Sequence, residues 1–438
     1  MVRFFKRHAW LLALIAFLLL FPQALSSQAR LNNRVIITGL AIDKIQDGYE
    51  VTAQVVLPEP GSESGGEGAR LDFISEQGSS IAEGMKKISF NIGEIAGLSH
   101  TNFILVGESM FEDNLVADMD YFLRDDHLPN SVMLLCCEGS AKEQIKKTGE
   151  LELSVGIALQ KVFIYKQGSL NSRMIALQDF ADSAFGQSGV SVLPELKITN
   201  ENDKQQETSG GDATGSNGGS SSSSQSSTGG ASSGTSSSSG SSSGASESAN
   251  KQGRIEFFTP IAYFKNGRFV DKITAQEDII GYLLTQNFTN TFDLVVENVN
   301  DGNVYKNAEV GLRIGKKTTT HKIDISGAVP KYKIDIVFDK VKLMEVINED
   351  VAYQGTYAVL KPYLNDALID AVKSSIEGRV IELFEKTKAQ NVDLFKIADR
   401  AYKYNKNDWQ KFLKGLGDID NYINKFEIEV NVSIKNFL

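Results

Sequence analysis

Few side chains in this chain could do chemistry, and none falls into a known catalytic pattern. The two cysteines, Cys136 and Cys137, are adjacent and end an apolar run. A catalytic thiol needs a nearby base and some exposure, and successive side chains of a strand face opposite sides of its sheet. We therefore interpret both cysteines as buried structural residues, with a vicinal disulfide or redox pair as the alternative.

His100 is the next candidate, because it precedes Thr101 and Asn102 just before a predicted buried strand. The chain has four histidines, and no cysteine or aspartate stands near this one at the spacing of a metal site. We interpret these three residues as a turn or a helix cap.

Acidic pairs occur, such as Asp125 with Asp126 and Asp418 with Asp420. Nothing in the pattern places one carboxyl group opposite another, as general acid–base catalysis would require. The sequence also lacks a nucleophile elbow, a phosphate-binding loop, a zincin motif and a dinucleotide fingerprint. We predict no enzyme activity, and therefore no catalytic residue, no cofactor-binding residue and no metal ligand.

Two basic residues could instead contact a partner. Lys316 and Lys317 are followed by three threonines and a histidine, residues 318–321. This composition predicts an exposed basic hairpin tip. A solvated turn is the simpler interpretation, and contact with a lipid or polymer surface is the alternative.

An aromatic group near the end of the chain is the second candidate for partner contact. Tyr402, Tyr404, Trp409 and Phe412 follow one another at helical spacing. Such a stripe usually packs into a core, which is the simpler interpretation. A patch that contacts a partner is the alternative.

The beginning of the chain has the features of an export signal. Arg3, Lys6 and Arg7 precede an unbroken apolar run at residues 10–21, and small polar residues follow Pro22. The run falls short of the ~20 residues that a bilayer span needs. We expect residues 1–29 to be a signal peptide or an uncleaved signal anchor, and the rest of the chain to be exported.

The clearest boundary is the Ser/Gly-rich segment at residues 201–253, which has no large apolar side chain between Thr208 and Ala249. Such a segment cannot bury enough surface to offset the entropy of ordering it, so we predict a disordered linker. It could tether independently moving domains, or it could be a loop insertion, which costs little per added residue; we favour the insertion. It separates an N-terminal region at 30–200, with 30–145 and 146–200 as possible subdomains, from a C-terminal domain at 254–438.

Before the linker, apolar runs bounded by turn residues alternate with helical patterns. The predicted strands are residues 34–43, 49–57, 71–77, 102–107 and 131–136. The predicted helices are residues 79–89, residues 111–123, and one that begins at Ser140, where Glu143 completes a capping-box pattern. This order is typical of an α+β fold with mixed β-sheets and packed helices.

After the linker, the same reasoning predicts further strands and a longer helix. The strands are residues 255–264, 268–273, 293–299, 308–314, 331–342 and 425–434. The helices are residues 358–388, 393–404 and 408–416. In residues 331–342, Tyr332, Ile334, Ile336 and Phe338 alternate mainly with polar neighbours, which predicts an antiparallel strand with one face in water.

The order of several segments resembles the Ger(x)C family, the C subunits of the nutrient germinant receptors of spore-forming bacteria. The segments are VIITGLAID (35–43), LSHTNFILVGESM (98–110), YFLRDDHLPNSVMLLCCEGSAKEQIK (121–146), VLPELKI (192–198), AYFKNGRFVDKITAQEDIIGYLL (262–284), DLFKIADRAYKYNKNDW (393–409) and KFEIEVNVSIKNF (425–437). The resemblance covers residues 34–438. It implies a chain of α+β domains, commonly three, and a non-enzymatic accessory subunit.

The resemblance also implies the partners and the location. Family members sit at the outer face of the inner spore membrane, beside integral membrane subunits of the A and B types. They are usually lipoproteins whose mature chain begins at a cysteine, but residues 24–31 contain none. We therefore expect no lipidated cysteine here, and membrane attachment through an N-terminal anchor or through the partner subunits.

The net charge adds one exclusion. The chain has 45 Lys and Arg against 55 Asp and Glu, a net charge of −10, which argues against a nucleic-acid partner. The function that we expect is therefore a role in nutrient-triggered spore germination by binding and assembly. An exported protein that binds the cell wall or a carbohydrate, or acts as a scaffold, is the alternative.

Overall fold

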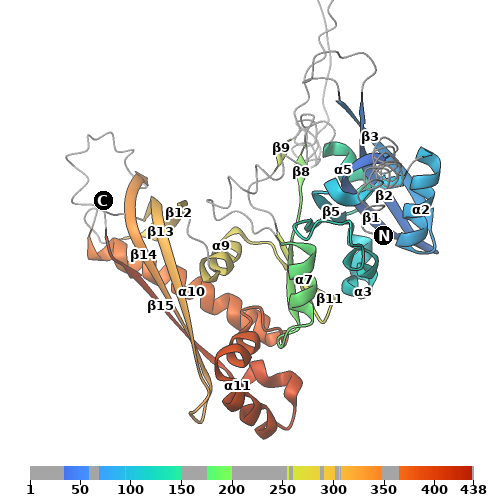
Figure 1. The fold of residues 1–438 in the computed structure, drawn as a ribbon. Helices are drawn as coiled ribbons and strands as arrows, with labels where there is room; N and C mark the ends of the chain where they lie inside the picture. Colours follow the sequence, from blue (N-terminus) through green and yellow to red (C-terminus); the bar gives the residue numbers. More distant parts are fainter. Residues whose placement is uncertain are drawn as a thin grey trace, which may run out of the picture.

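The computed structural model describes residues 34–58, 69–93, 95–148, 175–199, 254–255, 260–286, 291–300, 305, 307–347 and 365–436. The predicted signal at 1–29, the predicted linker at 201–253 and the first turns of the helix predicted at 358–388 lie outside the described residues. Within them the chain has an α+β fold with three larger β-sheets and one short strand pair (Figure 1).

The first sheet is mixed and has the order β3-β2-β1-β5-β6. Its strands are β1 (Arg34–Ile45), β2 (Gly48–Pro58), β3 (Ala69–Gly78), β5 (Phe103–Val106) and β6 (Met133–Cys136), and β4 (Ile95–Gly97) also pairs with β1. β1, β2 and β3 are antiparallel neighbours, whereas β5 and β6 run parallel to β1. β5 and β6 are apolar along their whole length because all their residues are buried.

Helices follow the strands of this sheet. α2 (Ile81–Ile92) begins after Ser80, whose side chain accepts a hydrogen bond from the amide of Glu83, and it buries Ile81, Met85 and Ile88 as its spacing predicts. α5 (Ala141–Thr148) follows β6.

The prediction of a single helix at residues 111–123 is wrong. A short 3₁₀ helix (Glu108–Phe111) is followed by the four-residue helices α3 (Leu115–Asp118) and α4 (Asp120–Leu123). Asn114 interrupts the path, because its side chain caps α3 and also donates to the carbonyl of Asn266.

The second sheet joins strands from both sides of the predicted linker. Its order is β11-β10-β7, where β7 (Val190–Pro194) pairs antiparallel with β10 (Ile261–Lys265), and β11 (Arg268–Ile273) pairs with β10. Asn266 and Gly267 have φ of 51° and 77°, as a two-residue type I′ hairpin requires. α7 (Leu177–Ala184) packs against β7.

The two ends of the predicted linker also meet. β8 (Ile198–Thr199) pairs antiparallel with β9 (Arg254–Ile255), so the residues on either side of 200–253 are neighbours. This arrangement favours a loop insertion over a tether between independent domains. The predicted domain boundaries remain a prediction.

The third sheet has the order β12-β13-β14-β15. Its strands are β12 (Phe292–Val299), β13 (Ala308–Asp324), β14 (Lys331–Ile347) and β15 (Glu427–Ile434). β13 and β14 form a hairpin much longer than the strands predicted at 308–314 and 331–342, and β15 runs parallel to β14. The predicted alternation in β14 is confirmed, because Tyr332, Ile334, Ile336 and Phe338 are all buried.

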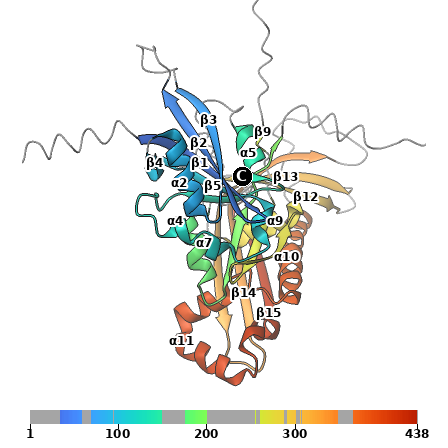
Figure 2. The same cartoon turned by 90° about the vertical axis from the view of Figure 1, so that its right-hand side faces the viewer.

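Helices cover this sheet and extend past its end. α9 (Gln276–Thr285) precedes the sheet, and α10 (Asp366–Ala389) packs against both edge strands, β12 and β15. α11 (Ile397–Gly415) consists of two helices that meet at a kink at Asn405. This agrees with the two helices predicted at 393–404 and 408–416, although the first begins only at Ile397. α11 lies beside the turn between β13 and β14 in both views (Figures 1 and 2).

Candidate functional site

The adjacent cysteines are buried free thiols, as their place at the end of a strand predicts. Cys136 packs into the main core, with Sγ 3.6 Å from the carbonyl oxygen of Pro194, and Cys137 packs into a second core on the opposite side of the sheet. The pKa of both thiols is raised, mainly because burial disfavours the charged thiolate. A neutral, inaccessible thiol is a poor nucleophile and a poor metal ligand.

The predicted turn at His100 is also present. His100 ends a short 3₁₀ helix (Leu98–His100) and is exposed, while Thr101 is buried and donates to the carbonyl of Ile37 at 3.3 Å. Among the residues that the structure describes, no three His, Cys, Asp or Glu side chains gather closely enough to hold a metal ion.

The prediction of a basic hairpin tip at Lys316 and Lys317 is wrong. Lys316 and Lys317 lie in the middle of β13, and the turn to β14 comes after Asp324. Lys316 is exposed, but Lys317 is 2% exposed, and its Nζ donates to the carbonyls of Leu284, at 2.6 Å, and of Gln286. Lys317 therefore satisfies backbone oxygens at the end of α9, where a positive charge also complements the helix dipole.

The predicted aromatic patch is divided between core and surface. Trp409 is 1% exposed and packs against Phe412 and Tyr422, with ring centroids 5.5 and 5.2 Å away. Tyr402 is partly buried against the core, whereas Tyr404 is 73% exposed. The four side chains do not form one surface, because the kink at Asn405 changes the direction in which the second half of α11 faces. Contact of Tyr402, Tyr404 or Lys316 with a partner remains a prediction.

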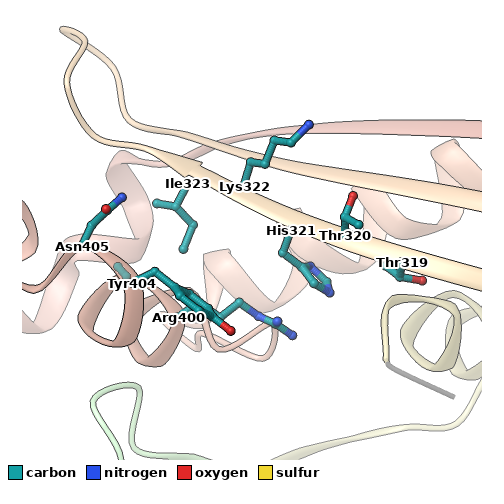
Figure 3. Close-up of a pocket in the computed structure, with 9 residues that line it drawn as sticks. Thr319, Thr320, His321, Lys322, Ile323, Arg400, Tyr404 and Asn405 are labelled. Carbon is teal, nitrogen blue, oxygen red and sulfur yellow. The ribbon is translucent and has the colours of Figure 1, made fainter.

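A polar cleft of about 490 Å³ lies between β13 and α11 (Figure 3). Residues 319–323 of β13 form one wall, and Arg400, Ala401, Tyr404 and Asn405 form the other. Arg400 extends along the helix towards His321, and Tyr404 lies at the same wall (Figure 3). Lys322 and Arg400 are the charged residues among those that line it.

His321 is the histidine of this cleft. Its Nδ1 lies 2.8 Å from the hydroxyl oxygen of Tyr332, and the two rings stack with an interplanar angle of 6°. Burial, and then the positive charge of Arg400, lowers the pKa of His321 to about 4. The imidazole is therefore neutral at pH 7, and the positive charges of the lining are those of Lys322 and Arg400.

Arg400 and the cleft were not found from the sequence. The cleft combines a strand wall and a helix wall about 80 positions apart in the chain, and no local spacing links them. The available signal was the stretch of threonines after Lys317, which continues the β-branched pattern and could have extended the predicted strand to His321.

In the part of the chain that the structure describes, no helix combines the length and the apolar composition needed to cross a membrane.

Comparison with known proteins places both halves of the chain. Residues 27–198 match the family described as spore germination protein N-terminal domain, and residues 259–436 match the family described as spore germination B3/GerAC-like, C-terminal. Spore germination protein B3 of Bacillus subtilis (strain 168) is 26% identical over 178 residues, which cover 40% of this chain and 46% of that protein. The match thus spans about half the length of that relative.

A solved structure is also similar. It is titled crystal structure of the GerBC protein; the similarity covers 91% of this chain and 97% of that one, with 16% sequence identity and a TM-score of 0.44. Because the two family domains match in order and together cover most of the sequence, the chain belongs to the GerAC-like, or Ger(x)C, family of spore germination proteins.

Proposed function

We propose that this protein is a non-enzymatic accessory subunit of a spore germinant receptor, needed for nutrient-triggered germination. The observation that carries the proposal is the match of both GerAC-like domains, in the family's order, to residues 27–198 and 259–436. The proposed partners are integral membrane subunits of the A and B types. The proposed location is the outer face of the inner spore membrane, held by an N-terminal anchor or by the partners.

The state of the reactive side chains supports a role in binding and assembly. The thiols are buried and neutral. The amine of Lys317 is held by backbone carbonyls, and the buried carboxylate of Asp393 accepts bonds from the amides of Ile397 and Ala398 and from the hydroxyl of Tyr422. Each of these groups stabilises the fold instead of facing a substrate.

Deletion of the gene in its spore-forming host tests the proposed function. We expect spores of the deletion strain to lose germination with at least one nutrient, and a copy of the intact gene to restore it. Normal germination with every nutrient, in a strain without a second member of this family, would contradict the proposal.

A pulldown tests the proposed partners against the alternative of a cell-wall protein. The mature chain is incubated with detergent-solubilised spore membranes and, separately, with purified peptidoglycan. We expect recovery of integral membrane subunits and no retention on peptidoglycan. The buried position of Trp409 removes one side chain from the aromatic surface that a sugar would stack on.

Sequencing the mature amino terminus decides between cleavage and a retained anchor.

A further inference from the structure

Arg400 is a positive charge without an acidic partner in the cleft between β13 and α11. Its Nε donates to the carbonyl of Phe395 at 3.3 Å, and no ion pair joins it to an acidic side chain of the described residues. Arg313, in contrast, holds Asp293 through Nε at 2.7 Å and through a terminal nitrogen at 2.9 Å. The terminal nitrogens of Arg400 are therefore available to a ligand.

The rest of the lining favours an anion. None of the residues that line the cleft is acidic, although the chain as a whole carries a net charge of −10. Lys322 is already paired with Asp335 at 3.1 Å, and His321 is neutral at pH 7 because its pKa is about 4. One uncompensated positive charge remains, which fits one negative charge on the ligand.

We propose that this cleft binds a small organic carboxylate. The planar guanidinium of Arg400 offers two parallel N–H groups that match the two oxygens of a carboxylate. Asn405 supplies a further polar group, while Ala401, Ile323 and the ring of Tyr404 offer surface to the carbon skeleton (Figure 3). A cavity of about 490 Å³ is within the usual range of small-molecule sites.

The same lining disfavours a phosphate group. Phosphate sites usually combine several positive charges with backbone amides at a helix N-terminus or in a glycine-rich loop. Here Arg400 is the single unpaired cation of the lining, and the amides of Ile397 and Ala398 at the start of α11 are already bound by the carboxylate of Asp393. Inorganic phosphate is therefore the competing anion to test.

Binding is measured by isothermal titration calorimetry on the purified full chain at pH 7, with benzoate, its neutral analogue benzamide, and inorganic phosphate as probes. We expect benzoate to bind at least ten times more tightly than benzamide or phosphate. Arg400→Gln should weaken benzoate binding at least tenfold. Lys414→Gln removes one charge from an exposed site on the same helix, outside the cleft, and should leave binding unchanged.

A second variant guards against a folding defect in Arg400→Gln. Tyr404 is 73% exposed, so Tyr404→Ala should fold normally and weaken benzoate binding several-fold. Equal binding of benzoate and benzamide, no binding of benzoate, or tighter binding of phosphate would overturn the proposal. The proposal does not depend on the receptor function, because the experiment uses the isolated chain and the deletion experiment uses spores.

Discussion

Replacing Lys317 by methionine should change how the stability of this protein depends on pH. Lys317 is 2% exposed, and its Nζ has Leu284 and Gln286 carbonyls and the hydroxyl of Thr319 as acceptors. These acceptors favour the charged ammonium, whereas removal from water favours the neutral amine. The loss of water dominates and lowers the pKa of Lys317 to about 7, from an ordinary value near 10.5.

The sign and size of the effect follow from proton linkage. Between pH 7 and pH 10 the unfolded chain keeps the proton of Lys317 while the folded chain releases it, so the free energy of unfolding rises with pH. The slope is about 1.4 kcal/mol per pH unit once the folded amine is neutral. Integrated from pH 7, where the folded amine is half protonated, to pH 9, Lys317 adds about 2 kcal/mol of stability.

Methionine has a similar length and no charge, so Lys317→Met should lose this increase. The assay is urea unfolding at pH 7, 8 and 9, followed by the fluorescence of Trp409 in a background where Trp10, the second tryptophan, is replaced by phenylalanine. Lys316→Met, at the exposed neighbouring position, is the matched control and should keep the wild-type pH dependence. A Lys317→Met curve parallel to the wild type would refute the reasoning and show that the acceptors hold a charged ammonium.

Two further predictions concern the first sheet. Asp43→Ala should lower the free energy of unfolding, measured with a denaturant, by about 2 kcal/mol. The buried carboxylate of Asp43 accepts hydrogen bonds from the amides of Ala141, at 2.7 Å, and Lys142, at 2.9 Å, at the start of α5. An unchanged unfolding midpoint would contradict this capping role. Cys136 and Cys137 should react with a thiol reagent at pH 8 only after unfolding, and fast labelling of the native chain would show that they are accessible.

The start of α5 shows how far a local pattern can reach. The S-x-x-E pattern at Ser140 correctly predicts a helix start. The Ser140 hydroxyl, however, lies 3.5 Å from the amide of Glu143, which is a long and weak hydrogen bond. The shorter bonds come from Asp43, 98 residues earlier in the chain. Sequence spacing detects partners within one helical turn, whereas this partner is set by the parallel pairing of β1 with β5 and of β5 with β6.

At Lys317 the local composition leads to a wrong prediction. Two lysines, three threonines and a histidine have the composition of an exposed turn, and the prediction treated them so. The pairing of β13 with β14 instead continues through these residues, and the alternation of strand faces turns Lys317 and Thr319 inward. Their burial is possible because the end of α9 supplies carbonyl acceptors, which the local sequence does not reveal.

The sequence by itself determined the α+β class, most strands and helices, the buried cysteines and the family, because periodicity, turn residues and the order of segments are properties of the chain. Tertiary structure alone decided that β7 and β10 pair across the predicted linker, that Trp409 is buried while Tyr404 is exposed, and that Arg400 faces a cleft without an acidic partner. These features depend on contacts between residues far apart in sequence. Such contacts follow from packing and register, which no short window of residues specifies.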